Sequence, residues 1–382
     1  MLSRTDRNAL SDWWWTVDRT MLAALAALIS IGLILSLAAS PAVAERINLS
    51  SFYFVERQAM YLVPAIAVMI GVSLLDERQG RRAALVIFVI GCALMVATLF
   101  VGAEVKGARR WLSVGGVNLQ PSEFVKPAFV VLVAWLFAER IKRPDMPGNL
   151  LAFVLLGIFV ALLVPQPDFG QTMLATLVWG ALFFAAGLSW IWIFALAGIA
   201  AMGIVLAYFM LRHVRERIDG FLTPGSADTY QVDRSLEAFV NGGWLGRGPG
   251  EGIVKQSLPD SHADFVFAVA GEEFGAVACM LLVLLFAFIV LRGIGHAGRS
   301  EDPYPRLAIT GLVVLFGLQS VINMAVNLSL MPAKGMTLPF VSFGGSSIIS
   351  LAYAMGMVLG LSRRRAQAAP IIKDLVPGAG RA

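Results

Sequence analysis

The chain contains 382 residues, of which 58% are hydrophobic and only 14% are charged. Soluble domains carry roughly 25% charged residues, so this composition excludes an ordinary water-soluble enzyme. The formal net charge of +5 is explained by membrane topology and by contact with anionic lipid, and no nucleic-acid partner is expected.

Apolar runs recur along the chain, and a spanning helix needs about 20 mostly apolar residues. Ten such runs lie at about 21–40, 57–75, 83–102, 122–138, 149–164, 170–187, 189–210, 265–291, 306–329 and 341–361. Because they lack period-2 alternation, they predict helices and not the strands of a barrel. We therefore expect an all-α integral membrane protein with ten transmembrane helices, forming one domain over residues 21–362.

The distribution of Lys and Arg predicts the orientation of these helices. Segments such as 78–82 and 363–365 are rich in arginine, and cytoplasmic loops carry an excess of basic residues. The N-terminal segment 1–20 and the tail 363–382 are therefore both expected in the cytoplasm. Two long connections, 103–120 and 211–264, then lie on the outer side.

The loop 211–264, between the seventh and eighth helices, is far longer than ordinary loops, which suggests function. It contains a predicted amphipathic helix at Tyr230–Val240, whose apolar side consists of Val232, Leu236, Phe239 and Val240. The glycine-rich stretch 241–252 follows. Such glycine density permits close backbone approach to a partner or ligand, although a mobile surface loop is an equal alternative.

Basic residues cluster near the first outer loop. Lys106, Arg109 and Arg110 precede Trp111, and Lys126 follows in the next helix. Four cations at the bilayer surface could bind a diphosphate; ordinary contact with anionic lipid is the alternative. Glu123 is placed at i,i+3 from Lys126, on the same helix face.

Further polar positions interrupt the apolar runs. The stretch Gln166–Gln171 predicts a tight outer turn or a broken helix that lines a cavity, with Asp168 as a turn-forming residue. The stripe Gln319, Asn323 and Asn327 is typical of side chains that bond neighbouring helices. Glu272 and Glu273 are intramembrane acids, which are usually functional or paired.

The segment Leu258–Ala268 carries Asp260, His262 and Asp264 directly into a long apolar helix. Asp264 is thereby predicted at the boundary between a water-facing loop and the membrane. A carboxylate at this boundary can reach a lipid head group.

Several of these motifs together resemble the FtsW/RodA (SEDS) family. They are Lys106–Trp111, Gln120–Glu123, Gln166–Gly170, Leu258–Phe265 with Glu272 and Glu273, and Pro332–Ser347. The resemblance implies ten transmembrane helices and polymerisation of lipid II into peptidoglycan glycan strands. Phe343 departs from the family pattern, which usually has Tyr before Gly-Gly, so any role of that hydroxyl is in doubt.

The resemblance also implies partners and a location. The family works beside a class B penicillin-binding protein, a transpeptidase. Lys334–Thr337 looks more like the cell-division branch than the elongation branch. We therefore expect a multi-pass protein of the bacterial inner membrane, located at the division septum with other divisome membrane proteins.

Asp264 matches the family's catalytic aspartate, which implies a general base for one inverting transfer. The candidate substrate-binding residues, for the diphosphate or the sugars, are Lys106, Arg109, Arg110, Glu123, Lys126, His262, Lys334 and Ser342. No cofactor is evident. A divalent cation could share the stabilisation of the diphosphate, but the two cysteines and three histidines show no metal-ligand spacing.

Two other classes of function compete with a polymerase. Intramembrane acids and a broken helix would suit a lipid II flippase or a proton-coupled transporter. Against a transporter, the halves of the chain show no internal repeat, and the longest loop is predicted outside the midplane. A non-catalytic division scaffold is the third alternative, although segments 1–20 and 362–382 are short for recruiting partners.

Overall fold

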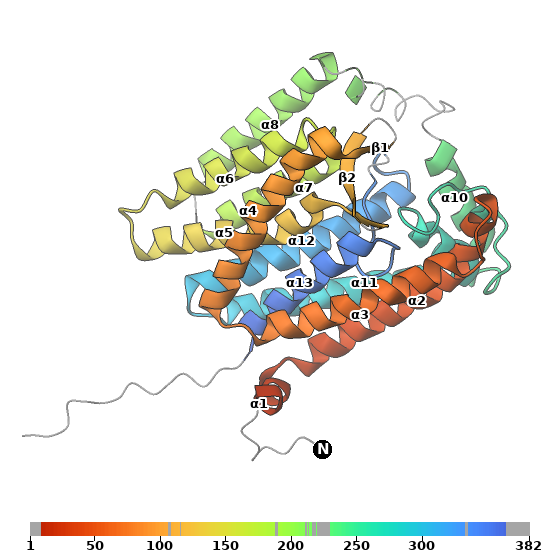
Figure 1. Cartoon of the computed structure of the whole chain (residues 1–382), viewed down its shortest axis with the longest axis horizontal. Coiled ribbons are helices and arrows are strands. Elements are labelled where there is room, and N and C mark those ends of the chain that lie inside the picture. Colours follow the sequence, from red (N-terminus) through yellow and green to blue (C-terminus); the bar gives the residue numbers. More distant parts are fainter. Residues whose placement is uncertain are drawn as a thin grey trace, which may run out of the picture.

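The computed structural model describes residues 9–105, 108–114, 116–187, 190–210, 212, 214–215, 219, 230–332 and 335–363. Its long helices pack side by side (Figure 1). The helices are α1 (Ala9–Thr16), α2 (Arg19–Arg46), α3 (Tyr53–Leu74), α4 (Glu77–Val101), α5 (Pro121–Lys142), α6 (Gly148–Leu163), α7 (Phe169–Ala185), α8 (Trp190–Met210), α10 (Tyr230–Gly242), α11 (Val266–Gly298), α12 (Pro303–Asn327) and α13 (Gly345–Leu361).

Each of the ten predicted apolar runs falls on one of these helices. Five of them, α2, α3, α4, α11 and α12, are long and apolar enough to cross a membrane. The helices α6, α7 and α13 are apolar but shorter. The structure therefore agrees with a multi-pass helical membrane protein, and the number of crossings stays a prediction.

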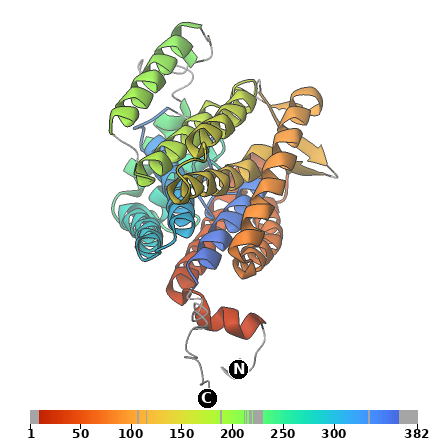
Figure 2. The same cartoon turned by 90° about the vertical axis from the view of Figure 1, so that its left-hand side faces the viewer.

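The helix α5 occupies the centre of the bundle. All of its residues from Val125 to Ala134 are buried, and it packs against α4, α6, α7, α12 and α13. A helix that is apolar on every side belongs inside a bundle. By contrast, α8 lies at the periphery in both perpendicular views (Figures 1 and 2).

The two ends of the bundle differ. The N-terminal helix α1 lies at one end, and at the opposite end lie α10 and three short strands (Figure 1). These strands are β1 (Ala103–Val105), β2 (Ala108–Val114) and β3 (Val117–Leu119), and they form an antiparallel sheet in the order β1-β2-β3.

At the α1 end, the Arg292 guanidinium of α11 binds both carboxylate oxygens of Asp18, at 2.6 and 2.8 Å. Asp18 also caps α2, so this ion pair joins the start of α2 to the end of α11.

The helix α11 is broken at Gly275, where φ is +80° and ψ is 176°. The glycine-rich loop fits into this break. The amide of Ala276 donates to the carbonyl of Gly243 at 2.9 Å, and the amide of Arg247 donates to the carbonyl of Glu272 at 3.0 Å. The close backbone approach expected from the glycines is therefore made to the chain's own helix.

The amphipathic helix predicted at 230–240 is confirmed as α10, and part of its apolar side is exposed. Val232 is buried, whereas Leu236 is 37% exposed and Val240 is 81% exposed. The side that packs against the bundle carries small residues, because α10 lies directly on α11 and α12. The Ser235 hydroxyl, for example, donates to the carbonyl of Asn327 at 2.7 Å.

We predict that Gly275→Ala destabilises the protein by about 1–3 kcal/mol, because this backbone conformation is essentially restricted to glycine. An added Cβ would also lie 2.4 Å from both the amide nitrogen of Gly246 and the carbonyl oxygen of Trp244. Thermal unfolding in detergent measures the change. Gly180→Ala on α7 is the matched control, since its Cβ would meet nothing within 4 Å. Equal unfolding midpoints for both variants would contradict the prediction.

Candidate functional site

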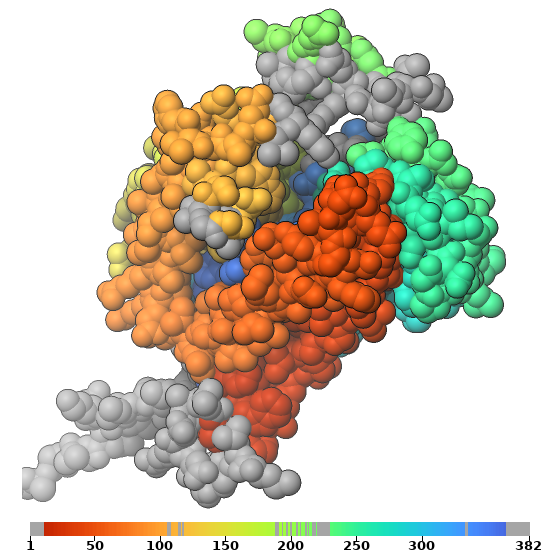
Figure 3. All heavy atoms as spheres, turned by 45° about the vertical axis from the view of Figure 1, so that its right-hand side comes forward, coloured from red at the N-terminus to blue at the C-terminus, as the bar shows by residue number. Residues whose placement is uncertain are grey.

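A cavity of about 600 Å³ lies at the end of the bundle that carries the strands. Its walls come from α3, the β-sheet, the start of α5, the segment 260–265, α12 and the segment 335–347. Figure 3 shows it as a hollow, with the blue C-terminal segment visible between the orange segments. Segments far apart in the sequence therefore meet around one space.

Asp264 lines this cavity, and its backbone is held by two side-chain amides of α12. The Nδ2 groups of Asn323 and Asn327 each donate to the carbonyl of Asp264 at 2.9 Å. Asn327 also accepts the amide of Ala268 through Oδ1 at 3.1 Å. The first turn of α11 and Asp264, two residues before the helix begins, are thereby fixed to α12.

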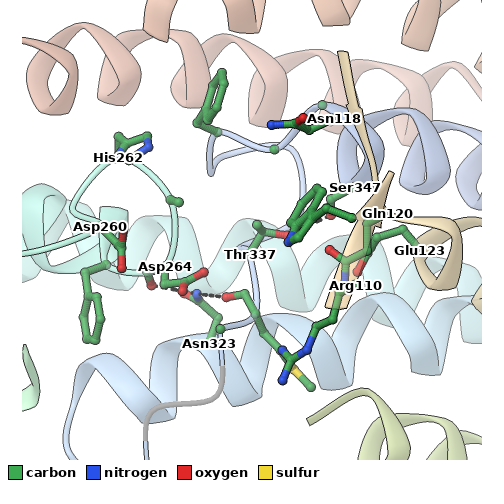
Figure 4. A pocket seen from close by; sticks show the side chains of 18 of the residues that line it. Arg110, Asn118, Gln120, Glu123, Asp260, His262, Asp264, Asn323, Thr337 and Ser347 are labelled. Carbon is green, nitrogen blue, oxygen red and sulfur yellow. Dashed lines mark hydrogen bonds between the residues drawn. The ribbon is translucent and has the colours of Figure 1, made fainter. Parts of the chain in front are cut away.

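The same polar stripe holds the opposite loop. Asn323 donates to the carbonyl of Met336 at 2.6 Å, and Gln319 donates to the carbonyl of Thr337 at 3.1 Å. The loop comes close to the carboxylate, because a Cβ on Gly335 would lie 3.7 Å from Asp264 Oδ2. The stripe predicted to bond neighbouring helices therefore orders two walls of the cavity (Figure 4).

The two adjacent arginines of β2 have different surroundings. Arg110 lines the cavity on the side facing Asp264 (Figure 4). Its guanidinium donates to the carbonyls of Gln166 and Pro167 at 2.9 and 2.5 Å. The Arg109 side chain is 50% exposed, pairs with Glu104 at 3.4 Å and does not line the cavity. Alternation along a strand separates the two side chains that the sequence placed together.

The contacts of Arg110 also explain the motif at 166–171. Asp168 caps α7 by accepting the amide of Gln171 at 3.3 Å, and its Oδ2 lies 3.7 Å from the Arg110 guanidinium. Burial raises the pKa of Asp168, and the guanidinium acts in the opposite direction. The turn predicted here therefore helps to orient a cavity residue.

Glu123 and Lys126, which the sequence placed on one helix face, form a buried ion pair of 2.9 Å, and Lys126 does not line the cavity. Gln171 donates to the same Glu123 oxygen at 2.8 Å, and Lys126 also contacts Gln319 Oε1 at 3.4 Å. Glu123 lines the cavity, and its second oxygen is buried without a hydrogen bond among the described residues. A buried carboxylate oxygen left in this way favours a bound polar group.

His262 lines the cavity between two aromatic rings. Its ring centroid lies 4.1 Å from that of Phe54 and 5.5 Å from that of Phe343. Burial lowers the pKa of His262 to about 4. The imidazole is therefore neutral near pH 7, and its Nδ1 is buried without a hydrogen bond in the described part of the chain.

The remaining candidates lie elsewhere. Lys106 and Lys334 fall outside the described residues. Ser342 is buried and accepts the amide of Leu338 at 2.7 Å, so it closes a turn and does not line the cavity. Sequence reasoning missed two lining residues of α3, Arg57 and Tyr61. Their i,i+4 spacing near a predicted helix end was the available signal.

The intramembrane acids of α11 serve the loop and not the cavity. Glu272 accepts the amides of Ile253, Val254 and Lys255 at 2.7–3.0 Å. Glu273 pairs with the Lys255 ammonium and accepts the amide of Gly250 at 3.0 Å. Among the described residues, no group of three or more His, Cys, Asp or Glu side chains could hold a metal ion.

Comparison with known proteins identifies the family. The family model for FtsW, RodA and SpoVE, described as cell cycle protein, matches residues 18–367. A relative from Caulobacter vibrioides, a probable peptidoglycan glycosyltransferase FtsW, is 48% identical over 95% of this chain and 93% of its own. The chain belongs to the FtsW/RodA/SpoVE family. A relative of the same name from Geobacter metallireducens is 35% identical over 91% of this chain and 95% of its own.

Solved structures of similar proteins support the fold of this FtsW/RodA/SpoVE member. A chain from a peptidoglycan synthase complex, described as coordinating polymerization and crosslinking, has a TM-score of 0.74 and 25% identity, covering 91% of this chain and 97% of that one. The rod shape determining protein RodA of Thermus thermophilus has a TM-score of 0.68 and 25% identity, and the match covers 92% of this chain and 99% of that one. The family predicted from the sequence motifs is therefore confirmed.

We predict that Asn323→Asp destabilises the protein by about 1–3 kcal/mol. The substitution removes the side-chain NH2 group that donates hydrogen bonds to the carbonyls of Asp264 and Met336. Ser320→Ala is the matched control on the same helix, since the Ser320 hydroxyl donates within α12 to the carbonyl of Phe316, at 2.8 Å. Thermal unfolding of both variants measures the difference. If Asn323→Asp unfolds no earlier than Ser320→Ala, the amide does not hold these two segments.

Proposed function

We propose that this protein is a peptidoglycan glycosyltransferase that polymerises lipid II into glycan strands, with Asp264 as the general base. The observation that carries the proposal is the cavity itself. It brings the Asp264 carboxylate, fixed through its backbone to α12, into one space with the Arg110 guanidinium. A base and a cation across one cavity suit transfer of a sugar from a diphosphate leaving group.

In the proposed step, a hydroxyl of the acceptor sugar attacks the anomeric carbon of the donor. Asp264 takes the proton from that hydroxyl as the new glycosidic bond forms. The bond from the anomeric carbon to the diphosphate breaks, and the electron pair leaves with undecaprenyl diphosphate. A single displacement inverts the anomeric configuration and needs no carboxylate nucleophile.

The leaving diphosphate needs positive charge, which Arg110 and Arg57, the described arginines that line the cavity, would supply. Lys334, which precedes the lining residue Gly335, and Lys106, two residues before the lining residue Ala108, would add to this charge. A divalent cation bound with the diphosphate could share the role. His262 contributes no charge near pH 7, because burial holds its pKa at about 4, so it is proposed to contact the sugars as a neutral group.

The transporter hypothesis finds less support. Glu272 and Glu273, the acids that suggested it, bind backbone amides and Lys255 of the same chain. We propose instead that the protein works with a class B penicillin-binding protein and other divisome proteins at the septum, with both termini in the cytoplasm. The solved peptidoglycan synthase complex, described as coordinating polymerization and crosslinking, supports such a partnership.

Reconstitution with lipid II, with and without a partner transpeptidase, tests the proposed function. We expect glycan polymer from the wild type and a loss of about 10²–10⁴-fold in rate from Asp264→Asn, which removes the base and keeps the shape. Asp260→Asn, which also changes a carboxylate that lines the cavity, should retain most activity. A folded Asp264→Asn variant with near wild-type rate would remove the base assignment. Lipid II scrambling without polymer would support a flippase, and neither product would support a scaffold.

The two neighbouring arginines offer a second test. We expect Arg110→Gln to lower kcat/KM about tenfold to a hundredfold, since a hydrogen bond to a charged group contributes roughly 1.5–3 kcal/mol. Arg109→Gln should have little effect, because the Arg109 side chain does not line the cavity. Both variants are assayed with lipid II after their unfolding midpoints are compared with the wild type. Equal activities in the two variants would assign Arg110 only a structural role.

A further inference from the structure

The glycine-rich loop ends in a tip with exposed apolar side chains. Trp244 is 71% exposed and Leu245 is 82% exposed, and Val240, at the end of α10, is 81% exposed. In a water-facing loop these three side chains would leave a large apolar surface in contact with solvent. The depth of these side chains in the membrane decides whether water or lipid surrounds them.

Hydrogen bonds between the loop and α11 indicate that depth. The amides of Ala276 and Val277 donate to the carbonyls of Gly243 and Trp244 at 2.9 and 3.2 Å. Both amides lie within the stretch Phe274–Leu291, which contains no charged residue. At 1.5 Å per residue this stretch spans roughly 27 Å, close to the ~30 Å hydrocarbon core of a bilayer. The loop tip is therefore placed just inside the hydrocarbon region.

The polarity around the tip agrees with that placement. Non-helical backbone at membrane depth is tolerated where its polar groups are satisfied inside the protein. Here the amides of Arg247 and Gly248 donate to the carbonyls of Glu272 and Glu273, both at 3.0 Å. The carboxylates of these two glutamates are buried and bonded to the same loop. The two glutamates thus face inward and the three apolar side chains of the tip face outward, whereas Arg247 and Glu251 of the same loop are exposed.

The tip also continues the outward-facing apolar side of α11. Val277 is 40% exposed, Met280 is 48% exposed and Leu281 is 62% exposed. We propose that Trp244, Leu245 and Val240 are immersed in the acyl chains of the adjacent leaflet, which is the outer leaflet in the predicted orientation. The loop that leads to Asp264 is then a re-entrant segment, with Trp244 near the interface that tryptophan favours.

A nitroxide spin label tests the immersion without any assay of activity. The label is attached at Leu245→Cys in a background with Cys92→Ala and Cys279→Ala, and the protein is reconstituted into phosphatidylethanolamine–phosphatidylglycerol vesicles. Leu284→Cys, on the outward side of α11, is the lipid control, and Glu251→Cys, exposed in the same loop, is the water control. Relaxation by oxygen and by a water-soluble nickel chelate is measured for each label.

We expect the label at position 245 to match the lipid control, with the ratio of oxygen to nickel relaxation severalfold above that of the water control. A ratio equal to the water control would show an aqueous loop and overturn the proposal. Protection from both reagents would also overturn it, because the site would then be covered by protein. Gel filtration of each labelled protein establishes that it is folded and monodisperse.

Discussion

The donation of two side-chain amides to one carbonyl is the interaction on which the site depends. Asn323 and Asn327 both bind the carbonyl of Asp264, and Asn323 also binds Met336 across the cavity. In a bundle surrounded by lipid, a buried amide or carbonyl without a partner is costly. Conformations that break these hydrogen bonds are therefore strongly disfavoured. The carboxylate is consequently carried on a fixed backbone, although it lies where a loop becomes a helix.

A second constraint acts on the other side of the same segment. The break at Gly275 frees backbone groups of α11, and the glycine-rich loop binds them. Glu272 then holds the returning chain at residues 253–255 through three backbone amides. Asp264 is therefore bound to α12 through its own carbonyl, and the segment 253–255 that precedes it is bound to α11.

The sequence predicted much of this arrangement, for identifiable physical reasons. Apolar runs of bilayer length located the helices, and the spacing of Glu123 and Lys126 placed them on one helix face, where they form an ion pair. The sequence could not show that Arg110 lines the cavity and Arg109 does not. Which side of a short strand faces a cavity depends on how the sheet packs. The surroundings of the apolar side of α10 could not be predicted for a related reason. Periodicity shows that a helix is amphipathic, but it does not show whether lipid or protein meets its apolar side.

The central claim is that Asp264 and Arg110 serve the same displacement, Asp264 at the attacking hydroxyl and Arg110 at the leaving diphosphate. A structure of the Asp264→Asn variant with a bound lipid II analogue tests this claim most directly. We predict that the diphosphate lies against the Arg110 guanidinium and that the attacking sugar hydroxyl lies within about 3.2 Å of the side chain at position 264. A ligand bound at the bundle midplane, with its diphosphate away from Arg110, would contradict the account.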